Sequence, residues 1–387
     1  MPSSSVCSVI CDSPALKGRV FPHASPSPPK AAIPLAVVLL LAAPAAADTT
    51  PEQYRSIVDG TIANYLRPEF AKLEQETAAL LPAVRGLCAA PSFESLGEAR
   101  AAFGKVVLAW SRVEYARLGP VIVDHRLERF SFWPDPKGIG LRQVQKLLAD
   151  KDESATDPVT LADKSVALQG LQSLEFVLFG TGSEDLPGGE DFRCAYAAAI
   201  AGNLDTIAQE IVAGWDDEAG YVALMRNPGP DNPVYRAPEE PVGDVVEILT
   251  TGFQFIRDVR IGAFVGENPN KAKPRRAAFW RSGLAIDAIA ANFDGLEALF
   301  EASGLVPVIE TRPDGPGFVG SVRFEFNSAR ESFDQGFPPV AEAVADPAEH
   351  SRLLYLFIVA NTLWKYFTED ISAALGLRTG FNALDGD

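Results

Sequence analysis

The sequence has few of the residues that most often build a catalytic metal site. Its 387 residues include only three histidines and four cysteines. Neither H-E-x-x-H nor H-x-x-E-H occurs, so the common spacings that bring two histidines and a glutamate to one zinc ion are absent. A histidine-ligated catalytic zinc usually needs two or three histidines and a base. The sequence therefore disfavours a zinc peptidase.

Several other motifs of catalysis and of β-structure are absent as well. The chain has no glycine-rich nucleotide loop, no nucleophile elbow and no C-x-x-C pair. A serine or cysteine hydrolase would lack the histidine context that activates its nucleophile. Alternating runs of β-branched residues, which are typical of strands, are scarce. The scarcity of strand patterns favours an all-α protein, and the missing motifs argue against these enzyme classes.

The N-terminal segment has the pattern of an export signal. Lys30 precedes an apolar stretch over residues 31–47 that ends in three alanines. This ending suits signal peptidase, and the stretch is shorter than the about 20 apolar residues that span a bilayer. We expect cleavage near Ala47, a periplasmic protein and no stable membrane anchor, with a retained anchor as the alternative. Residues 1–19 are unusual for a leader, which a misassigned start codon would explain.

The chain is acidic, and this excludes one large class of partners. Its net charge is −17, and removal of residues 1–47 makes it −19, because that segment holds three basic residues and one acidic residue. An acidic protein repels phosphate backbones, so we expect no nucleic-acid partner. Metal ions are compatible with this charge, although in the simplest interpretation it serves solubility.

Two cysteines, Cys88 and Cys194, are left after cleavage. In an oxidising compartment this number favours a disulfide, with two separately buried thiols as the alternative. The bridge would close a large loop, for which the chain-entropy model allows roughly 4–5 kcal/mol of stabilisation, a figure that strain often reduces.

A proline-rich segment divides the chain. Five prolines lie between Asn227 and Pro241, which excludes a helix or a central strand there. The mature length of about 340 residues also suits two domains better than one core. The predicted organisation is a signal peptide at 1–47, a first domain at 48–226, a linker at 227–242 and a second domain at 243–387.

Capping patterns indicate four main helices in each domain. Thr50 with Pro51, and Asp346 with Pro347, are typical helix starts. A weak echo between the two domains fits a duplication, so we predict two four-helix-bundle-like domains joined by the proline-rich linker. The expected helices are 50–87 with bends at Pro68 and Pro82, 92–116, 161–179, 191–215, 243–265, 276–303, 320–345 and 347–375.

The third expected helix carries an informative polar stripe. Gln172 and Glu175 are three residues apart and share a helix face with Gln169, while leucines form a core seam. Gly170 permits close approach of another helix or of a ligand. Because a buried glutamate needs a partner, the stripe is either a polar network inside the bundle or a ligand or metal site.

Acidic side chains of neighbouring segments suggest a cation pocket. Glu114, Asp135 and Glu175 would offer the oxygen ligands that hard cations prefer. His125 is a further candidate ligand, with an exposed loop histidine as the alternative. A salt-bridged interior cluster, with arginines as the neutralising partners, is the alternative for the acidic residues.

The second domain offers Arg323 and Asn327 on one helical stripe, although ordinary solvated polar faces give the same pattern. His350 falls in the first turn of the last expected helix, and we expect it at the surface. The predicted ligand-binding residues are Gln172, Glu175, Glu114, Trp110, Asp135, Arg129, Arg323 and Asn327. The predicted metal ligands are Glu175, Glu114, Asp135 and His125.

Residues 170–180, GLQSLEFVLFG, resemble the G-x-H-x-x-E segment of imelysin-like proteins. Residues 110–135 and the C-terminal tail at 380–387 agree with that family in order and spacing, so the resemblance covers essentially all of 50–387. The family was named for a reported peptidase activity, with the histidine and the glutamate as suspected metal ligands. Gln172 stands where the motif has histidine, and a carboxamide oxygen is a weaker ligand for zinc or iron.

The resemblance implies two bundles that pack together around a cleft, and a link to iron acquisition in the cell envelope. We therefore predict a non-enzymatic periplasmic protein in iron or other metal uptake, which binds iron, another divalent cation or a small ligand for an envelope uptake system. The alternatives are a residual metallopeptidase and a protein that binds a polysaccharide or an outer-membrane partner. The binding platforms in the last case would be Trp110, Trp133, Trp280 and Trp364.

Overall fold

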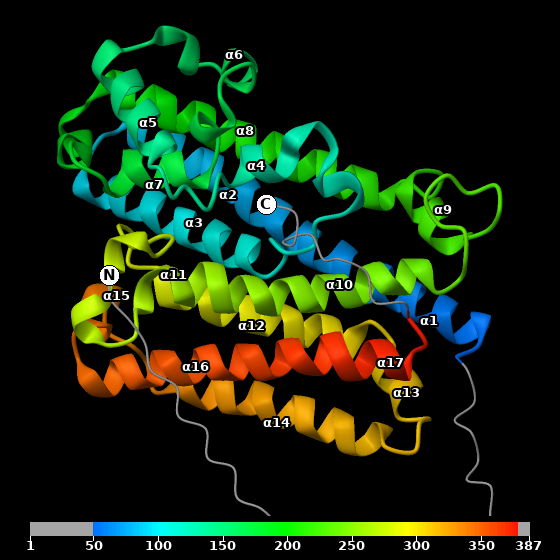
Figure 1. Cartoon of the computed structure of the whole chain (residues 1–387). Helices are drawn as coiled ribbons and strands as arrows, with labels where there is room; N and C mark the ends of the chain where they lie inside the picture. Colours follow the sequence, from blue (N-terminus) through cyan, green and yellow to red (C-terminus); the bar gives the residue numbers. More distant parts are fainter. Residues whose placement is uncertain (1–48, 378–387) are drawn as a thin grey trace, which may run out of the picture. The chain divides into compact units, whose positions relative to one another are not determined.

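The computed structural model describes residues 49–377, and this part of the chain contains helices and no strand (Figure 1). The prediction of an all-α fold is confirmed. Residues 49–377 belong to one compact unit. The division into two domains and their duplication stay predictions, and we call residues 49–226 the first half and 240–377 the second half. The expected signal peptide, the cleavage site at Ala47 and the tail at 380–387 lie outside the described residues.

The helices of the first half are α1 (Pro51–Thr61), α2 (Arg67–Ala89), α3 (Phe93–Ser111), α4 (Arg126–Phe130), α5 (Ile139–Asp150), α6 (Pro158–Ala162), α7 (Leu171–Phe179), α8 (Asp191–Asp216) and α9 (Tyr221–Arg226). Those of the second half are α10 (Glu240–Gln254), α11 (Gly262–Val265), α12 (Ala285–Ala302), α13 (Leu305–Ile309), α14 (Gly315–Asp334), α15 (Val340–Ala343), α16 (Pro347–Lys365) and α17 (Ser372–Ala374). Within residues 49–377, no helix is both long and apolar enough to cross a bilayer.

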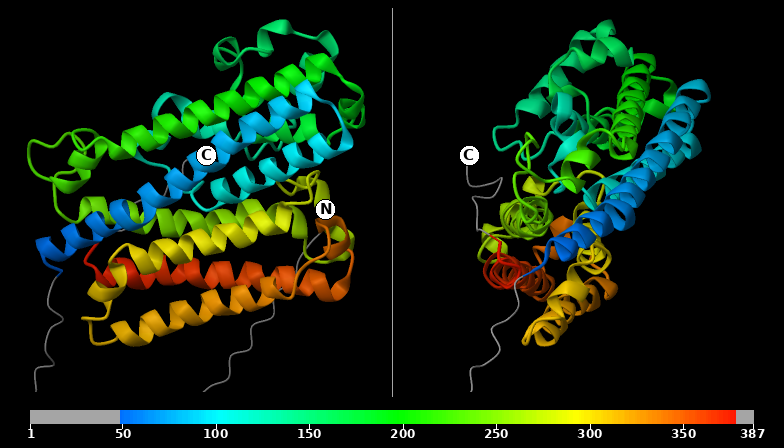
Figure 2. Two further views of the ribbon diagram at one scale, coloured as in Figure 1. Left: turned by 180° about the vertical axis from the view of Figure 1, so that it is seen from behind. Right: turned by 90° about the vertical axis from the view of Figure 1, so that its right-hand side faces the viewer.

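The first expected helix is a long helical run that joins the two halves. The Thr50 side chain caps α1, and a π-helical turn at Ile62–Leu66 leads from α1 into α2. Pro68 stands at the start of α2, where its missing N–H removes one bond of the helical ladder. α1 packs on α10 and α12, whereas α2 packs on α3 and α8 (Figure 2).

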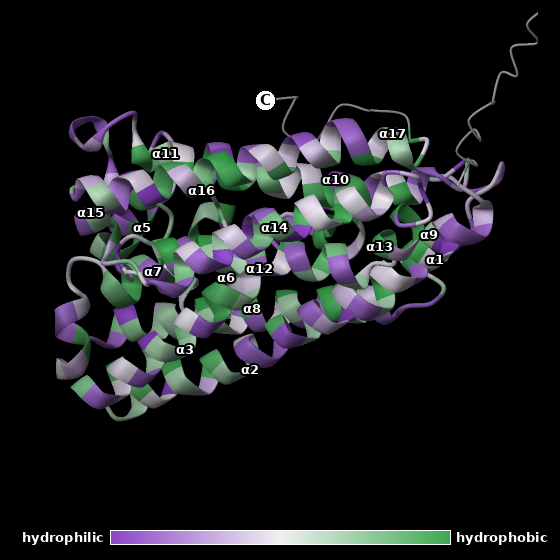
Figure 3. Ribbon diagram, turned by 90° about the horizontal axis from the view of Figure 1, so that it is seen from below, coloured by the Kyte–Doolittle hydropathy of each residue, from purple (hydrophilic) through white to green (hydrophobic). Residues whose placement is uncertain are grey.

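Each half buries an apolar layer between its long helices. In the second half α10, α12, α14 and α16 pack as a four-helix arrangement, in which α10 contacts α12 and α16, and α14 contacts the same two helices. Figure 3 shows hydrophilic residues along many outward-facing helix turns and hydrophobic residues in the interior of this arrangement. In the first half the disulfide Cys88–Cys194 joins α2 to α8, with 5.5 Å between the two Cα atoms, as predicted.

The expected helix at 161–179 is wrong in its first half. α6 ends at Ala162, a 3-10 turn covers Val166–Leu168, and α7 begins only after Gly170. A Cβ on Gly170 would overlap the carbonyl oxygens of Arg129 and Phe130, so the chain breaks here to let that backbone cross. Close approach at Gly170 is therefore confirmed, and the neighbour is the end of α4.

The expected helix at 276–303 is also too long, because α12 begins at Ala285. Phe279 and Gly283 have φ values of +58° and +79°, which interrupt a helix. The backbone N–H groups of Arg281 and Ser282 donate to Glu175 instead of to a helical ladder. A contact with the other half thus overrides the local helical preference.

Candidate functional site

Helix α7 carries Gln172 and Glu175 of the predicted polar stripe, and Glu175 is bound by the second half of the chain, whereas Gln169 precedes the helix. Glu175 Oε1 accepts hydrogen bonds from Arg281 N at 3.1 Å, Ser282 N at 3.0 Å and Ser282 Oγ at 2.9 Å. Gln172 Nε2 donates to Ser131 Oγ at 2.9 Å. Glu175 is 3% exposed and Gln172 is half-buried. The interface therefore holds the glutamate in place before any ligand arrives.

Burial governs the acidity of Glu175. The loss of hydration raises the pKa of this carboxyl, and the Ser282 and Arg281 donors offset part of that rise. Arg281 Nη1 lies 4.0 Å from Glu175 Oε2, which places a positive charge near the second oxygen without a hydrogen bond. One carboxylate oxygen is thus fully occupied by protein donors.

A small pocket opens beside these residues, and we call it the α7 pocket. Its lining comes from α7, from the loop and α5 residues between 132 and 144, and from residues 277–281 of the second half. Its volume is about 60 Å³. Three of the predicted site residues, Gln172, Glu175 and Asp135, share this lining.

Asp135 has a structural task in the same loop. Its two carboxylate oxygens accept from Ile139 N and Gly140 N, each at 2.8 Å, at the first turn of α5. These bonds satisfy N–H groups that a helix start leaves without partners. The side chain therefore fixes the pocket loop onto α5 and has little capacity left for a cation.

Glu114 lies in a separate buried cluster between the two halves. Arg260 Nη2 pairs with both of its carboxylate oxygens, and Asn292 Nδ2 donates to Oε1 at 2.7 Å. Arg260 is itself sandwiched between Phe255 and Phe279, at 5.2 and 5.3 Å from its guanidinium carbon to the ring centres. Since Phe279 also lines the α7 pocket, the cluster supports one wall of that pocket.

Two predicted residues of the first half stabilise the core. Trp110 is 1% exposed and stacks on Phe130 with 4.4 Å between ring centres. Arg129 donates to Gln169 Oε1 at 2.9 Å and to Asn203 Oδ1 at 3.0 Å. Both side chains hold α4 against its neighbours, and neither lines the α7 pocket.

The remaining predicted residues lie away from the pocket. The His125 side chain is 83% exposed, with Glu128 at 3.9 Å. Arg323 on α14 pairs with Glu301 at 2.7 Å, and Asn327 Oδ1 accepts from Arg330. Helix α14 packs on α12, α13 and α16, so its polar stripe serves contacts within the second half.

The donor set does not fit a bare metal ion. The four predicted ligands are distributed over a buried ion pair, a helix cap, an interface carboxylate with one oxygen occupied by protein donors, and an exposed loop. Among residues 49–377, no three His, Cys, Asp or Glu side chains are grouped so that they could hold a metal ion. A catalytic zinc needs such a group, so we derive no hydrolytic step through a metal.

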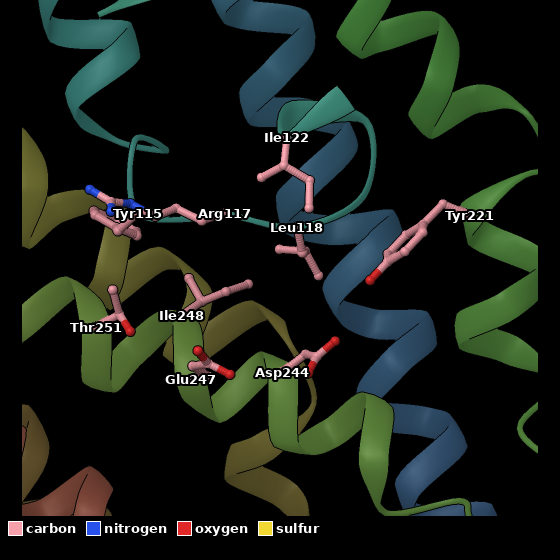
Figure 4. Close-up of a pocket in the computed structure, with 9 residues that line it drawn as sticks. All are labelled: Tyr115, Arg117, Leu118, Ile122, Tyr221, Asp244, Glu247, Ile248 and Thr251. Carbon is pink, nitrogen blue, oxygen red and sulfur yellow. The ribbon is translucent and has the colours of Figure 1, made fainter. Parts of the chain in front are cut away.

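A second and larger pocket, of about 190 Å³, lies between the halves (Figure 4). One face of α10 carries Asp244, Glu247, Ile248 and Thr251, opposite residues 115–122 and Tyr221. Tyr235 Oη donates to Asp244 Oδ2 at 2.5 Å, and burial raises the pKa of the Asp244 carboxyl. Arg117 shares the lining, so the pocket combines both signs of charge.

Residues of the second half are the part of the site that the sequence did not single out. Arg281 and Ser282 hold Glu175, and Trp280, which was expected only as a binding platform for a polysaccharide or outer-membrane partner, lines the α7 pocket. The available signal was the run of basic residues just before them in the sequence, which stands out in an acidic chain.

Comparison with known protein families matches residues 66–358 to imelysin (peptidase family M75). The chain belongs to the imelysin family. No curated protein matches the chain. The resemblance predicted from the motif is thereby confirmed, and the departure at Gln172 is a property of this member of the imelysin family.

Two solved structures share the imelysin fold. An imelysin-like protein from Psychrobacter arcticum 273-4 has a TM-score of 0.72 and 17% identity, over 87% of this chain and 100% of that chain. A protein from Parabacteroides distasonis ATCC 8503, assigned as an iron-regulated protein A precursor, has a TM-score of 0.66 and 16% identity, over 84% and 98%. At these identities the likeness supports the fold only.

Proposed function

We propose that this imelysin-family protein is an exported, non-enzymatic binding protein. It captures a metal-bearing small ligand in the α7 pocket and serves an iron or other metal uptake system in the periplasm. The observation that carries the proposal is that residues of both halves meet at this pocket, with Gln172 and Glu175 on one side and Trp280 and Arg281 on the other. Pockets at such interfaces are common ligand sites.

Two further observations support this function over peptidase chemistry. The relative from P. distasonis is named as iron-regulated and as a precursor, which agrees with export and with iron metabolism. In this chain, the carboxylates that a catalytic zinc would require are engaged with Arg260, with α5 and with the 281–282 backbone. A role in binding needs no hydrolytic metal centre.

Titration calorimetry and thermal shift of the purified protein test the proposal, with ferrous, cupric and zinc ions and ferric citrate as probes. We expect heat and a higher Tm with at least one iron species. Gln172→Ala removes a polar group of the pocket wall and should weaken binding about tenfold. Asn327→Ala, on α14, is the matched control and should bind like the wild type. Absence of heat and of a Tm shift with every probe would refute the proposal.

A further inference from the structure

A segment of the second half is strongly basic in this otherwise acidic protein. Residues 268–286 contain no acidic residue, whereas the whole chain has a net charge of −17. We call these residues the basic segment. Its cations are Lys271, Lys273, Arg275, Arg276 and Arg281.

Most of these cations have no counter-charge. Lys271 pairs with Glu267 at 2.6 Å. Lys273, Arg275 and Arg276 are exposed, and no carboxylate of residues 49–377 lies within 4.0 Å of their charged groups. By contrast, the exposed Arg323 on α14 lies 2.7 Å from the carboxylate of Glu301. The segment therefore presents a local positive potential that the fold does not neutralise.

Two cations of the basic segment lie beside Trp280, a residue of the α7 pocket. The guanidinium carbons of Arg275 and Arg281 lie 5.7 and 4.6 Å from the centre of the Trp280 ring. Trp280 and Arg281 line the pocket. Arg281 makes no side-chain hydrogen bond within the described part of the chain, and its only carboxylate neighbour is Glu175 at 4.0 Å. Its N–H fork is thus available to an acceptor.

One residue of the pocket lining carries a donor without an acceptor. Trp133 Nε1 is buried and has no hydrogen-bond partner in residues 49–377, and Trp133 lines the pocket. A buried N–H without a partner is unfavourable, so an acceptor atom in the pocket would stabilise it. The volume of about 60 Å³ exceeds the roughly 10–15 Å³ that one water requires, which leaves room for a carboxylate group.

We propose that the α7 pocket recognises its ligand as an anion, by binding one carboxylate group of a small polycarboxylate or of its metal chelate. The carboxylate accepts from Trp133 Nε1 and the Arg281 guanidinium, while the rest of the anion lies over Trp280 beside Arg275 and Arg276. The inference rests on the proposed function and names its ligand class. A bare cation would meet the positive segment and the occupied oxygen of Glu175.

Calorimetric titration with citrate and with ferric citrate, at about 20 mM and about 200 mM salt, tests the anion inference. Salt screens electrostatic attraction but leaves the shape of the pocket unchanged, so a fall in affinity at the higher salt shows the contribution of charge. We expect both anions to bind, with affinity falling at the higher salt. Ferrous ions, neutral maltotriose and a short uronate oligosaccharide are the comparison probes, and each should bind more weakly than citrate.

Two variants and one control locate the site. Arg275→Gln with Arg276→Gln removes two exposed cations without touching the core, and we expect about tenfold weaker citrate binding and a smaller salt dependence. Trp133→Phe removes one donor and should cost about tenfold. Lys72→Gln with Arg85→Gln removes the same charge from exposed positions on α2 that do not line the pocket, and should leave affinity unchanged.

Several outcomes would overturn the inference. Equal citrate affinity in the Arg275/Arg276 variant and the α2 control would remove the basic segment from the site. Tighter binding of the uronate oligosaccharide would make the occupant a polysaccharide. If ferrous ions alone bind, and Gln172→Ala weakens them, the role in metal uptake stands with a bare cation as the ligand, and the anion inference falls. If no probe binds, both fall.

Discussion

At the scale of single residues, the most consequential contact is the buried ion pair Glu114–Arg260. Both side chains are nearly inaccessible, at 5% and 2% exposure, and they come from opposite halves of the chain. Asn292 completes the carboxylate's bonding. Loss of one partner would leave an uncompensated buried charge, which costs more than loss of both.

This pair gives a first prediction. Arg260→Met should lower the free energy of unfolding by about 3–5 kcal/mol, because Glu114 would stay buried without its cation. The double variant Glu114→Gln with Arg260→Met should cost less than the sum of the two single variants. Urea unfolding measures both. The exposed ion pair Arg323–Glu301 provides the control, since Arg323→Met should lower the free energy of unfolding by about 1 kcal/mol or less. If the losses of unfolding free energy in the two single variants add up to that of the double variant, Glu114 and Arg260 do not stabilise each other.

A second prediction concerns Asp244, which lines the larger pocket (Figure 4). Burial raises the pKa of its carboxyl from the ordinary value of 3.8, so the folded state binds this proton more tightly than the unfolded state. Stability from this group is therefore greatest below pH 3.8 and is lost as the pH rises through the raised pKa.

Asp244→Asn isolates this effect, because its amide oxygen still accepts from Tyr235 Oη. The stability of the wild type relative to the variant should decrease as the pH rises from below 3.8 towards neutrality. Chemical unfolding at a series of pH values gives the difference. A relative stability that is constant or rises with pH would show that the carboxyl is not destabilised by burial.

Residue chemistry also explains why the predicted metal ligands do not form one cation site. Glu114 and His125 lie away from the α7 pocket, with Arg260 and Glu128 as their partners, and Asp135 lines the pocket but is bound to the first turn of α5. His350, expected at the surface, is 3% exposed with Nε2 at 3.0 Å from Val265 O. Partners distant in the sequence decide these outcomes, and a single sequence does not reveal them.

At the scale of helices, the halves meet where α12 crosses the end of α3. Gly295 of α12 lies at this crossing, where a Cβ would overlap Arg112 O and Tyr115 Oη. Tyr115 Oη in turn donates to Asn292 O at 3.2 Å, within α12. The absence of a side chain at Gly295 therefore sets the distance between these two helices.

This crossing gives a third prediction. Gly295→Ala should lower the free energy of unfolding by about 1–3 kcal/mol or more, because the added methyl must displace backbone. Gly320→Ala is the matched control in α14, where nothing lies within 4 Å of a Cβ. That change should be neutral or stabilise by about 0.5–1 kcal/mol, since alanine favours a helix interior. Equal effects at both positions would contradict the close crossing.

Helix boundaries were predictable where local signals dominate. The Thr50 and Asp346 caps start α1 and α16 as expected, and α8 and the α10–α11 run agree with the predicted ranges. The expected helix at 320–345 is wrong at its end, because α14 ends at Asp334, and α3 ends at Ser111 instead of 116. The errors near the candidate site fall at the start of α7 and of α12, where Gly170 and the Glu175 carboxylate contact distant parts of the chain. Tertiary contacts outweigh propensity at these two positions, and both belong to the candidate site.

At the scale of the whole molecule, the two halves are joined by more than the proline-rich segment between α9 and α10, which ends earlier than the predicted linker because α10 already begins at Glu240. The α1–α2 run contacts helices of both halves, and the Glu114–Arg260 and Glu175–Ser282 contacts cross between them. These links bury charged groups that neither half could satisfy alone. The halves should therefore depend on one another for stability.

Calorimetry provides the fourth prediction. A thermal scan should show one cooperative transition, with calorimetric and van't Hoff enthalpies in agreement, because the halves share buried charges. The halves 48–226 and 243–387, expressed separately, should each melt at a lower temperature than the intact protein. Two resolved transitions in the intact protein, each matching one separate half, would instead support independent domains.

The sequence by itself determined the helical class, the family, the disulfide and the stripe of Gln172 and Glu175, because these follow from local periodicity, capping, motif spacing and the number of cysteines. Only the tertiary structure decided what the stripe faces. Residues 277–284 were expected to be helical but are not, and two backbone N–H groups of this segment donate to Glu175. As a result, Trp280 and Arg281 of the basic segment line the α7 pocket. That choice depends on hydrogen bonds between residues more than 100 positions apart, which no local pattern specifies.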